Sequence, residues 1–272
     1  MRTRRKNTLQ SLEHAVALLE LLRDHPAGLG LTELARRLRL TKPSTFRILN
    51  TLLECRYLTR SDTDGRYALG VRLWRLGCAA VEREASLREA AAPVLRRLAE
   101  QTHETSNLSI YDHGRIVYID SVESQQSLRF AARIGESAPA HAVATGKALL
   151  AFQPPEEIER VIRAGLEALT PKTIVTAADL MRELAAIRAS GVSRNLGESH
   201  PGVGAIAVPI FRPDGRVLAA ISVAGPLIRL SGPRMRTYEG LLREGAAEVT
   251  RRLGGGRPAP VAAGGARRGP PR

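Results

Sequence analysis

Cysteine is scarce in this sequence, and long apolar runs are absent. Cys55 and Cys78 are the only cysteines in 272 residues, which is too few for a disulfide scaffold and matches no zinc-binding spacing. No apolar run approaches the roughly 18 residues that a membrane-spanning helix requires. The basic start leads into a segment containing Glu13, His14 and Glu20, which is unlike a signal peptide. We therefore expect a protein of the reducing cytoplasm with no membrane partner.

The chain also lacks the residue spacings of common metal and catalytic sites. Its six histidines form no closely spaced metal-binding pair, and His141 is expected to be structural. Gly146-Lys147 resembles part of a phosphate-binding P-loop, but His141 stands where its first glycine should be, and Ala148 replaces the magnesium-binding hydroxyl. Residues 197–201 begin like a serine-hydrolase elbow but end in proline. We expect no metal, no cofactor and no enzymatic activity; the alternative, a small-molecule enzyme in the second half of the chain, would be decided by turnover assays.

Positive charge is abundant but unevenly distributed. Residues 1–75 carry 15 lysines and arginines against 7 acidic residues, whereas residues 76–250 carry 20 of each kind. Residues 251–272 have six arginines and no acidic residue. Basic ends around a neutral middle indicate a polyanion-binding module joined to a neutral one. A basic RNA-binding or nucleoid-type protein would also explain the net charge of +14, but it would not distinguish an operator from random duplex.

Residues 31–69 predict two short helices, a tight turn and a β-hairpin, which is the plan of a winged helix-turn-helix. The first helix covers about residues 31–40. The second begins after Thr41, a good N-cap, and ends near residue 54. Asp64-Gly65 marks the hairpin tip, because glycine accepts a positive φ without strain. An ordinary helical hairpin with a solvated face is the alternative, and the β-hairpin makes it less favoured.

The second predicted helix has an apolar and a polar arc at 100° per residue. The apolar arc contains Phe46, Ile48, Leu49, Leu52 and Leu53. Thr45 also falls within this arc, but in the first turn we expect it to project past the core. Helices of this kind enter the major groove by their N-terminal end. The expected DNA contacts are Lys42, Ser44, Thr45, Arg47 and Thr51, with Arg60 and Arg66 of the hairpin on the sugar-phosphate backbone. Exposed hairpin arginines also commonly serve solubility alone.

Beyond the hairpin, predicted strands alternate with predicted peripheral helices. A helix over residues 71–84 and a short connection near Ala85-Ser86 end the first domain. Two pairs of strands follow, each joined by a tight turn, and antiparallel hairpins with peripheral helices are typical of an α+β domain. The expected strands are 106–111, 116–122, 206–211 and 217–223, and the expected helices are 87–101, 145–152, 156–164, 177–189 and 235–253.

Small and polar residues gather where the expected strands and helices of this second domain begin and end. Ala144-Thr145-Gly146 opens a helix whose free N–H groups are suited to bind an anion such as a carboxylate. Residues 201–204 would let the backbone approach a ligand closely, and Ser222 alternates with apolar neighbours on the final strand. These residues indicate a small pocket with few polar groups. Tight turns and close packing are the alternative explanation.

The span from about Leu12 to Leu253 resembles the IclR family of bacterial transcriptional regulators. In the first domain the matching strings are LTELARRLRLTKPSTFRILNTLLECRYL and GRYALGVRLWRLG. In the second they are LREAAAPVLRRLAEQTHETSNLSI, RIVYIDSVES, PAHAVATGKALLAF, ASGVSRNLGESHPGVGAIAVPIF and DGRVLAAISVAGP. Their order and spacing make the resemblance highly specific.

The resemblance implies an α+β protein with an N-terminal winged helix-turn-helix, a linker helix used in dimerisation, and a GAF-like effector domain with an antiparallel sheet and flanking helices. These parts would be residues 1–70, 71–86 and 87–253, and the composition of residues 254–272 predicts a disordered basic tail. It further implies a homo-oligomer, a dimer or dimer of dimers, on palindromic double-stranded DNA. The implied function is a ligand-responsive regulator, expected to repress a metabolic operon, with a small organic acid or related metabolite as effector.

The resemblance also places the effector site at Ala144, Thr145, Asn195, Ala205, Ser222 and Ala224. The helix-start amides that hold effector carboxylates in the family map to Ala144 and Thr145. Asn195 stands at a frequently acidic position, and the usual two acidic residues beyond it are reduced to Gly197-Glu198. Ser222 is kept, while alanine occupies the two remaining positions. This less polar pocket predicts a larger or more apolar effector than glyoxylate or pyruvate.

Overall fold

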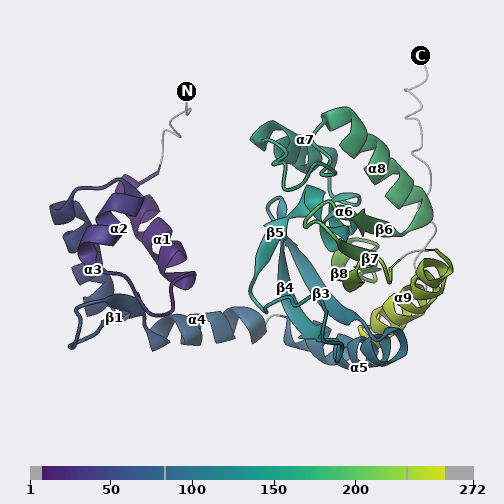
Figure 1. Ribbon diagram of the computed structural model, residues 1–272, viewed down its shortest axis with the longest axis horizontal. Helices are drawn as coiled ribbons and strands as arrows, with labels where there is room; N and C mark the ends of the chain where they lie inside the picture. The colour runs from purple at the N-terminus through teal and green to yellow at the C-terminus, as the bar shows by residue number, and fades with distance from the viewer. Residues whose placement is uncertain (1–7, 83, 231, 255–272) are drawn as a thin grey trace, which may run out of the picture. The chain divides into compact units, whose positions relative to one another are not determined.

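The structure, a computed structural model, describes residues 8–82, 84–230 and 232–254 (Figure 1). The chain divides into two compact units, and the boundary along the sequence lies between Glu84 and Ala85. The predicted division into DNA-binding, linker and effector domains stays a prediction, and the predicted basic tail lies outside the described residues except for its first residue, Gly254. Among the described residues, no helix has both the length and the apolar character needed to cross a membrane.

The first unit packs three helices around a small leucine core and adds a two-stranded antiparallel hairpin. Its elements are α1 (Gln10–Arg23), α2 (Leu31–Leu38), α3 (Lys42–Glu54), β1 (Leu58–Arg60), β2 (Tyr67–Leu69) and α4 (Val71–Glu82). Arg39 ends α2 in the left-handed conformation, with φ 55°, so the chain turns almost at once into α3. Gly65 has φ +69° at the hairpin tip, as its sequence predicts. The core is formed by Leu18, Leu22, Leu34, Leu49, Leu52, Leu58 and Tyr67.

The second unit is built on one antiparallel sheet of six strands in the order β5-β4-β3-β8-β7-β6. The strands are β3 (Thr105–Asp112), β4 (Arg115–Val122), β5 (Ser137–Pro139), β6 (Ser193–Leu196), β7 (Val203–Phe211) and β8 (Val217–Pro226). The helices are α5 (Ala85–Thr102), α6 (Ala144–Leu150), α7 (Pro155–Ala164), α8 (Ala177–Ser190) and α9 (Pro233–Arg252), with a short 3-10 turn η1 (Ala140–Ala142) before α6. The predicted α+β class is confirmed. The sequence did not predict β5 and β6, because these edge strands have only three and four residues.

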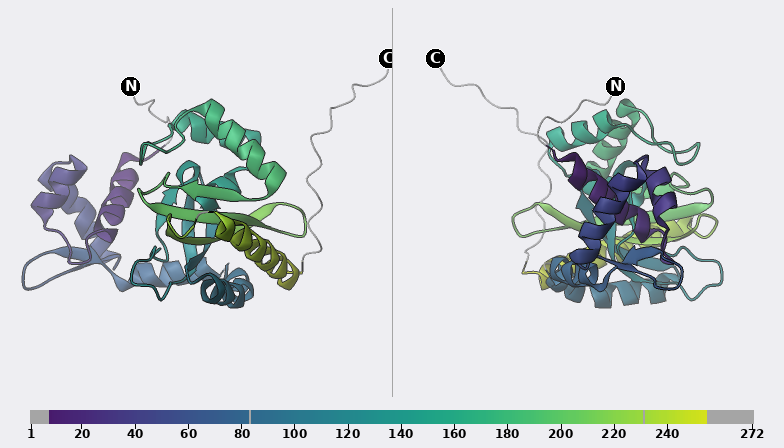
Figure 2. Two further views of the ribbon diagram at one scale, coloured as in Figure 1. Left: turned by 45° about the vertical axis from the view of Figure 1, so that its right-hand side comes forward. Right: turned by 90° about the vertical axis from the view of Figure 1, so that its left-hand side faces the viewer.

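Helices cover both faces of this sheet. On one face α5 and α9 pack against large aliphatic side chains of β3, β7 and β8. On the other face α6 packs against β7 and β8 through small side chains, and α7 and α8 pack on α6 in a further layer. Figure 2 shows α7 and α8 on the opposite side of the sheet from α5 and α9. The short helix α6 is therefore enclosed between the sheet and an outer pair of helices.

Candidate functional site

The N-terminal end of α3 exposes uncompensated positive charge. The hydroxyl of Thr41 accepts a hydrogen bond from the Ser44 N–H at 3.3 Å, so Thr41 is the predicted N-cap. The side chains of Lys42 and Arg47 are exposed, and neither has an ion-pair partner among the described residues. Thr51 is exposed as well, although its hydroxyl donates to the Arg47 carbonyl at 3.0 Å. This face of α3 is suited to meet a polyanion.

Two side chains of α3 do not lie where the sequence predicts. Thr45 is 0% exposed, and its hydroxyl donates to the Thr41 carbonyl at 3.0 Å. The expectation that Thr45 projects past the core is wrong, because it lies at the centre of the buried arc with Leu49 and Leu52. Phe46, expected within that arc, is 43% exposed because it lies at the edge of the arc. We therefore leave Thr45 out of the candidate DNA contacts.

The hairpin carries two exposed arginines with different surroundings. The guanidinium carbon of Arg60 lies 5.5 Å from the centroid of the Tyr67 ring, a cation–π distance. Arg66 Nε lies 3.2 Å from Asp64 Oδ2, so part of its charge is compensated at the hairpin tip. Both guanidiniums are accessible, and the aromatic ring restrains the orientation of Arg60.

A small cavity in the second unit brings together all six residues predicted for the effector site. Its volume is about 20 Å³, room for about one water molecule. Six further residues complete the wall: Asn107, Tyr118, Phe130, Val143, Ser199 and Val203. Of these, Val203 lies in the segment 201–204 that the sequence predicted for the pocket, and the sequence did not single out the other five for this site. None of the twelve lining side chains is charged. A ligand larger than water must displace some of these side chains to enter.

Strand register explains how residues far apart in sequence line the same cavity. Asn195 of β6 pairs with Ala205 of β7, which pairs with Ala224 of β8. On the next row, Ser222 of β8 pairs with Asn107 of β3. Paired residues share a face of the sheet, and this face is the one that α6 covers. Only this register would have identified Asn107, because no local pattern around it marks a ligand contact.

Two polar atoms in the cavity wall have no hydrogen-bond partner among the described residues. Asn107 is fully buried; its Oδ1 accepts from the Ser121 hydroxyl at 2.9 Å, while its Nδ2 is unpaired. The buried hydroxyl of Thr145, at the start of α6, also lines the cavity and is unpaired as well. A buried polar group without a partner costs about 1–3 kcal/mol, so native proteins rarely keep one without a reason. Both atoms are available to a ligand.

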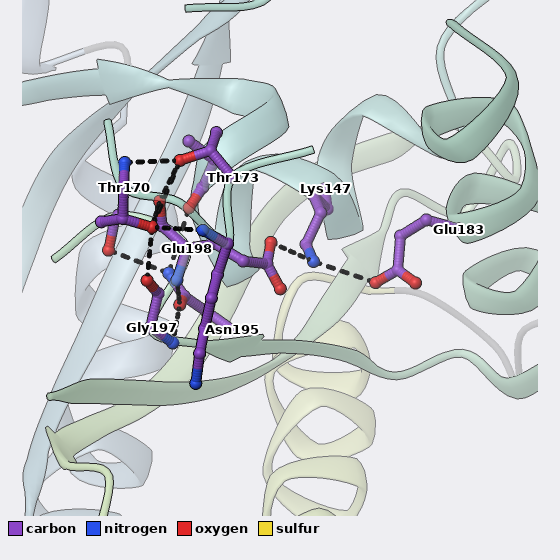
Figure 3. Close-up of polar contacts among 10 residues, drawn as sticks. Lys147, Thr170, Thr173, Glu183, Asn195, Gly197 and Glu198 are labelled. Atoms are coloured by element: carbon purple, nitrogen blue, oxygen red, sulfur yellow. Dashed lines mark hydrogen bonds and ion pairs between the residues drawn. The ribbon is translucent and has the colours of Figure 1, made fainter. Parts of the chain in front are cut away.

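Asn195 lines the cavity but uses its amide within the protein. Its Nδ2 donates to the Ala142 carbonyl at 3.0 Å and to the Ser199 hydroxyl at 2.9 Å. Its Oδ1 accepts from the N–H groups of Gly197 and Glu198 at 3.0 and 2.8 Å. The side chain therefore shapes the segment 195–199 (Figure 3). We therefore expect Asn195 to shape the cavity around a ligand and not to form a hydrogen bond to that ligand.

Two glycines of the predicted pocket motifs allow close packing within the protein. A Cβ at Gly204 would lie 3.0 Å from Leu227 Cδ1 and 3.2 Å from Leu230 Cβ. A Cβ at Gly146 would overlap the Ala140 carbonyl. The sequence predicts that residues 201–204 let a ligand approach the backbone closely. At Gly204, side chains of the protein occupy that position instead. Gly146 lets α6 lie directly against η1.

Lys147 is fully buried next to the cavity, with 0% exposure. Its Nζ lies 2.6 Å from Glu198 Oε2 and 2.9 Å from Glu183 Oε1 (Figure 3). The carboxyl side chain of Glu198 is 13% exposed, and that of Glu183 is 32% exposed. Burial raises the pKa of the Glu198 carboxyl above its ordinary value, and the attraction of the Lys147 ammonium opposes this shift.

Metal-ligating side chains do not cluster in the described part of the chain, where no group of three or more His, Cys, Asp and Glu residues could hold an ion. His141, predicted to be structural, is buried, and its Nε2 lies 3.0 Å from the Glu167 carbonyl oxygen. That contact fits a histidine that ties two segments of the fold together.

Sequence comparison identifies the family. Residues 79–251 match the family described as bacterial transcriptional regulator IclR C-terminal, and residues 11–62 match the IclR helix-turn-helix domain. The chain belongs to the IclR family. The resemblance read from its sequence is thereby confirmed, together with the N-terminal helix-turn-helix that binds DNA. IclR proteins are ligand-responsive transcriptional regulators and not enzymes, and some of them are repressors.

Named relatives span nearly the whole chain. The transcriptional regulator BhcR of Paracoccus denitrificans is 35% identical over 244 residues, which are 89% of this chain and 86% of the relative. The transcriptional repressor IclR of Escherichia coli is 31% identical over 250 residues, which are 91% of each chain. The crystal structure of an IclR homolog from Microbacterium hydrocarbonoxydans, complexed with 4-hydroxybenzoate, superposes with a TM-score of 0.74 at 27% identity. It covers 90% of this chain and 99% of the homolog.

Proposed function

We propose that this IclR-family protein binds a palindromic operator as a homodimer or dimer of dimers, and that a small organic acid in the α6 cavity changes its affinity for that operator. The cavity carries the proposal, because it combines all six predicted effector positions with two unpaired buried polar atoms. A regulator of chromosomal genes acts in the cytoplasm, where we place it. We propose repression of a metabolic operon as its mode of action.

On the DNA side, we propose that the N-terminal half of α3 enters the major groove. Lys42, Ser44, Arg47 and Thr51 are the candidate contacts on the helix. Arg60 and Arg66 of the hairpin would touch the sugar-phosphate backbone. The exposed, unpaired charges of Lys42 and Arg47 support this arrangement, because phosphate contacts supply much of the affinity for DNA.

The DNA proposal is tested by comparing Arg47→Ala with Arg66→Ala. The operator is first selected from a random duplex pool, and binding is then measured on it and on a scrambled duplex over a range of salt. Arg47→Ala should weaken operator binding by about 1–3 kcal/mol and relax sequence preference, as expected of a base contact. Arg66→Ala should lower the salt slope by about 0.9 without changing the preferred sequence. Wild-type affinities for both duplexes in Arg47→Ala would refute the role of α3.

On the effector side, the cavity chemistry indicates a small monocarboxylic acid with an aromatic or branched apolar body. Asn107 and Thr145 provide neutral polar contacts for carboxylate oxygens. Tyr118 and Phe130 provide aromatic walls against which a ring can pack. The absence of any charged lining side chain disfavours a polyanion. The homolog that holds 4-hydroxybenzoate makes this acid a natural first probe.

Calorimetry with 4-hydroxybenzoate, glyoxylate and pyruvate tests the effector class. We expect the aromatic acid to bind more tightly than either keto acid, and Asn107→Leu to weaken its binding because an amide donor is lost. Ser109→Ala is the matched control: its buried hydroxyl is also unpaired on the α6 face of the sheet, but it does not line the cavity. Tight binding of a two- or three-carbon keto acid, with no affinity for bulkier acids, would overturn the proposed class.

Effector binding at so small a cavity must be coupled to movement. About 20 Å³ does not accommodate an aromatic acid, so its entry displaces lining side chains and shifts the elements that carry them. Coupling between effector and operator of about 1–3 kcal/mol corresponds to a several-fold to hundred-fold change in operator affinity. Operator binding measured with and without saturating 4-hydroxybenzoate checks this magnitude. A reporter placed behind the operator then distinguishes repression from activation.

A further inference from the structure

Lys147 is a buried cation in a place where stability alone does not require one. A buried ion pair loses much of its Coulombic gain to desolvation, and apolar residues of similar volume often serve stability equally well. Yet Lys147 occupies the centre of α6 with no exposed surface, and its ammonium reaches two glutamates on other elements. This position suggests a role other than stability.

The two glutamates connect α6 to different parts of the unit. Glu183 lies on α8, in the outer layer of helices. Glu198 lies in the segment 195–199, which contributes two cavity-lining residues, Asn195 and Ser199. Lys147 itself follows closely on Ala144 and Thr145, which line the same cavity. The ion pair between Lys147 and Glu198 therefore joins two segments that both line the cavity, α6 and residues 195–199.

Other tethers of the segment 195–199 come from elsewhere. The hydroxyls of Thr170 and Thr173 donate to the carbonyls of Gly197 and Glu198 at 2.8 and 2.6 Å (Figure 3). The Asn195 amide donates to the Ala142 carbonyl of η1. Within the described residues, the Lys147–Glu198 pair is the one hydrogen bond or ion pair that joins α6 to this segment. Breaking it would leave the segment attached to its neighbours but free to shift relative to α6.

We propose that Lys147 is a positioning residue of the effector cavity, which holds the segment 195–199 against the start of α6 through its ion pair with Glu198. The pair keeps the cavity narrow in the absence of effector. It also couples the two segments mechanically, so that a displacement of α6 shifts residues 195–199, and the reverse. The effector part of this inference rests on the function proposed above, whereas the mechanical part does not. The two parts are therefore tested separately.

Hydrogen–deuterium exchange of the full-length protein tests the mechanical part without any effector. Glu198→Gln, and the double variant Lys147→Met with Glu198→Gln, should speed amide exchange in residues 195–199 by about tenfold or more, with the β7 and β8 amides unchanged. Glu183→Gln is the matched control, because it removes a carboxylate from the same lysine without touching the segment. Unchanged exchange in 195–199, or a uniform increase throughout the second unit, would overturn the proposal.

The effector part is read by calorimetry with 4-hydroxybenzoate as the probe. The double variant should bind it with an affinity changed by about fivefold or more, while Glu183→Gln binds it as the wild type does. Equal affinities of the double variant and the wild type would overturn this part. If the wild type does not bind the probe, the proposed effector class fails, and the exchange result still decides the role of Lys147.

Discussion

The two faces of the six-stranded sheet are made of side chains that differ in size and polarity. Facing α5 and α9, alternate positions of β7 and β8 carry large aliphatic residues: Ile206, Val208, Ile210, Ile221 and Val223. Facing α6, the intervening positions carry small ones: Ala205, Ala207, Ala220, Ser222 and Ala224. The unpaired buried atoms of Asn107, Ser109, Thr145 and Ser193 lie on this second side.

This difference separates stability from binding within the same strands. Successive side chains of a strand point to opposite faces, so one sequence can build a dry aliphatic core on one face and a small polar site on the other. Burial of large side chains stabilises the fold, whereas small residues leave space and unpaired polar atoms leave binding capacity. Substitutions on the face covered by α5 and α9 should therefore mainly change the free energy of unfolding. Substitutions on the face covered by α6 should mainly change the proposed effector response.

The largest loss of stability is expected on the aliphatic face. Ile221→Ala removes a fully buried side chain between β8 and the helices α5 and α9, and should lower the free energy of unfolding by about 2–5 kcal/mol. The adjacent residue, Ser222, lies on the α6 face. Ser222→Ala removes a single oxygen and should change the free energy of unfolding by less than about 1 kcal/mol. Urea unfolding of both variants measures the comparison. Equal losses would show that the two faces do not differ in this way.

Gly146→Ala tests the packing of α6 on the polar face. The added methyl group would overlap the Ala140 carbonyl, so α6 must shift away from η1. Overpacking of this kind costs about 1–3 kcal/mol, and the shift should also disturb the cavity wall at Ala144 and Thr145. Gly240→Ala, on α9 where a Cβ would have open space, is the control. Thermal unfolding of the two variants should separate them; similar midpoints would contradict the tight α6–η1 contact.

Ala224→Val and Ala219→Val compare the same added volume on the two faces of β8. At Ala219 the core is filled, so overpacking should cost about 1–3 kcal/mol. At Ala224 the side chain faces the cavity, so stability should fall by less, while binding of 4-hydroxybenzoate should be lost. Urea unfolding and calorimetry report the two effects. An Ala224→Val protein that binds the acid as the wild type does would argue against this cavity as the effector site.

The smallest effect concerns the pH dependence of Glu198. Its pKa is raised in the folded state, so the folded protein binds this proton more readily than the unfolded chain. The contribution of Glu198 to the free energy of unfolding therefore falls as the pH rises above the ordinary glutamate pKa of about 4.3. As the pH rises above about 4.3, the free energy of unfolding of the wild type should therefore fall relative to that of Glu198→Gln. Glu157 and Glu248, whose pKa values are lowered, act in the opposite direction but are common to both proteins. If the wild type instead became more stable relative to Glu198→Gln as the pH rose, the raised pKa of Glu198 would be contradicted.

Local patterns predicted most of the elements within about two residues of their observed ends. Alternation marked β3, β4, β7 and β8, and helical periodicity marked α3 and α8, because both are properties of consecutive residues. The edge strands β5 and β6 were too short to give such a pattern. Thr45 shows where prediction of burial from residue polarity fails on a helix. Its polar hydroxyl suggested exposure, but its position at the centre of the apolar arc buries it.

The sequence by itself determined the α+β class, the helix-turn-helix and the family, because motifs and periodicity are carried by neighbouring residues. The family resemblance also singled out six residues that prove to line one cavity, whose role as the effector site stays a prediction. Only the tertiary structure decided that Asn107 and Thr145 line the same cavity and that Lys147 pairs with Glu198. The physical reason is that strand register and the packing of α6 bring together residues far apart along the chain. No local pattern encodes which polar atoms remain unpaired once these elements meet.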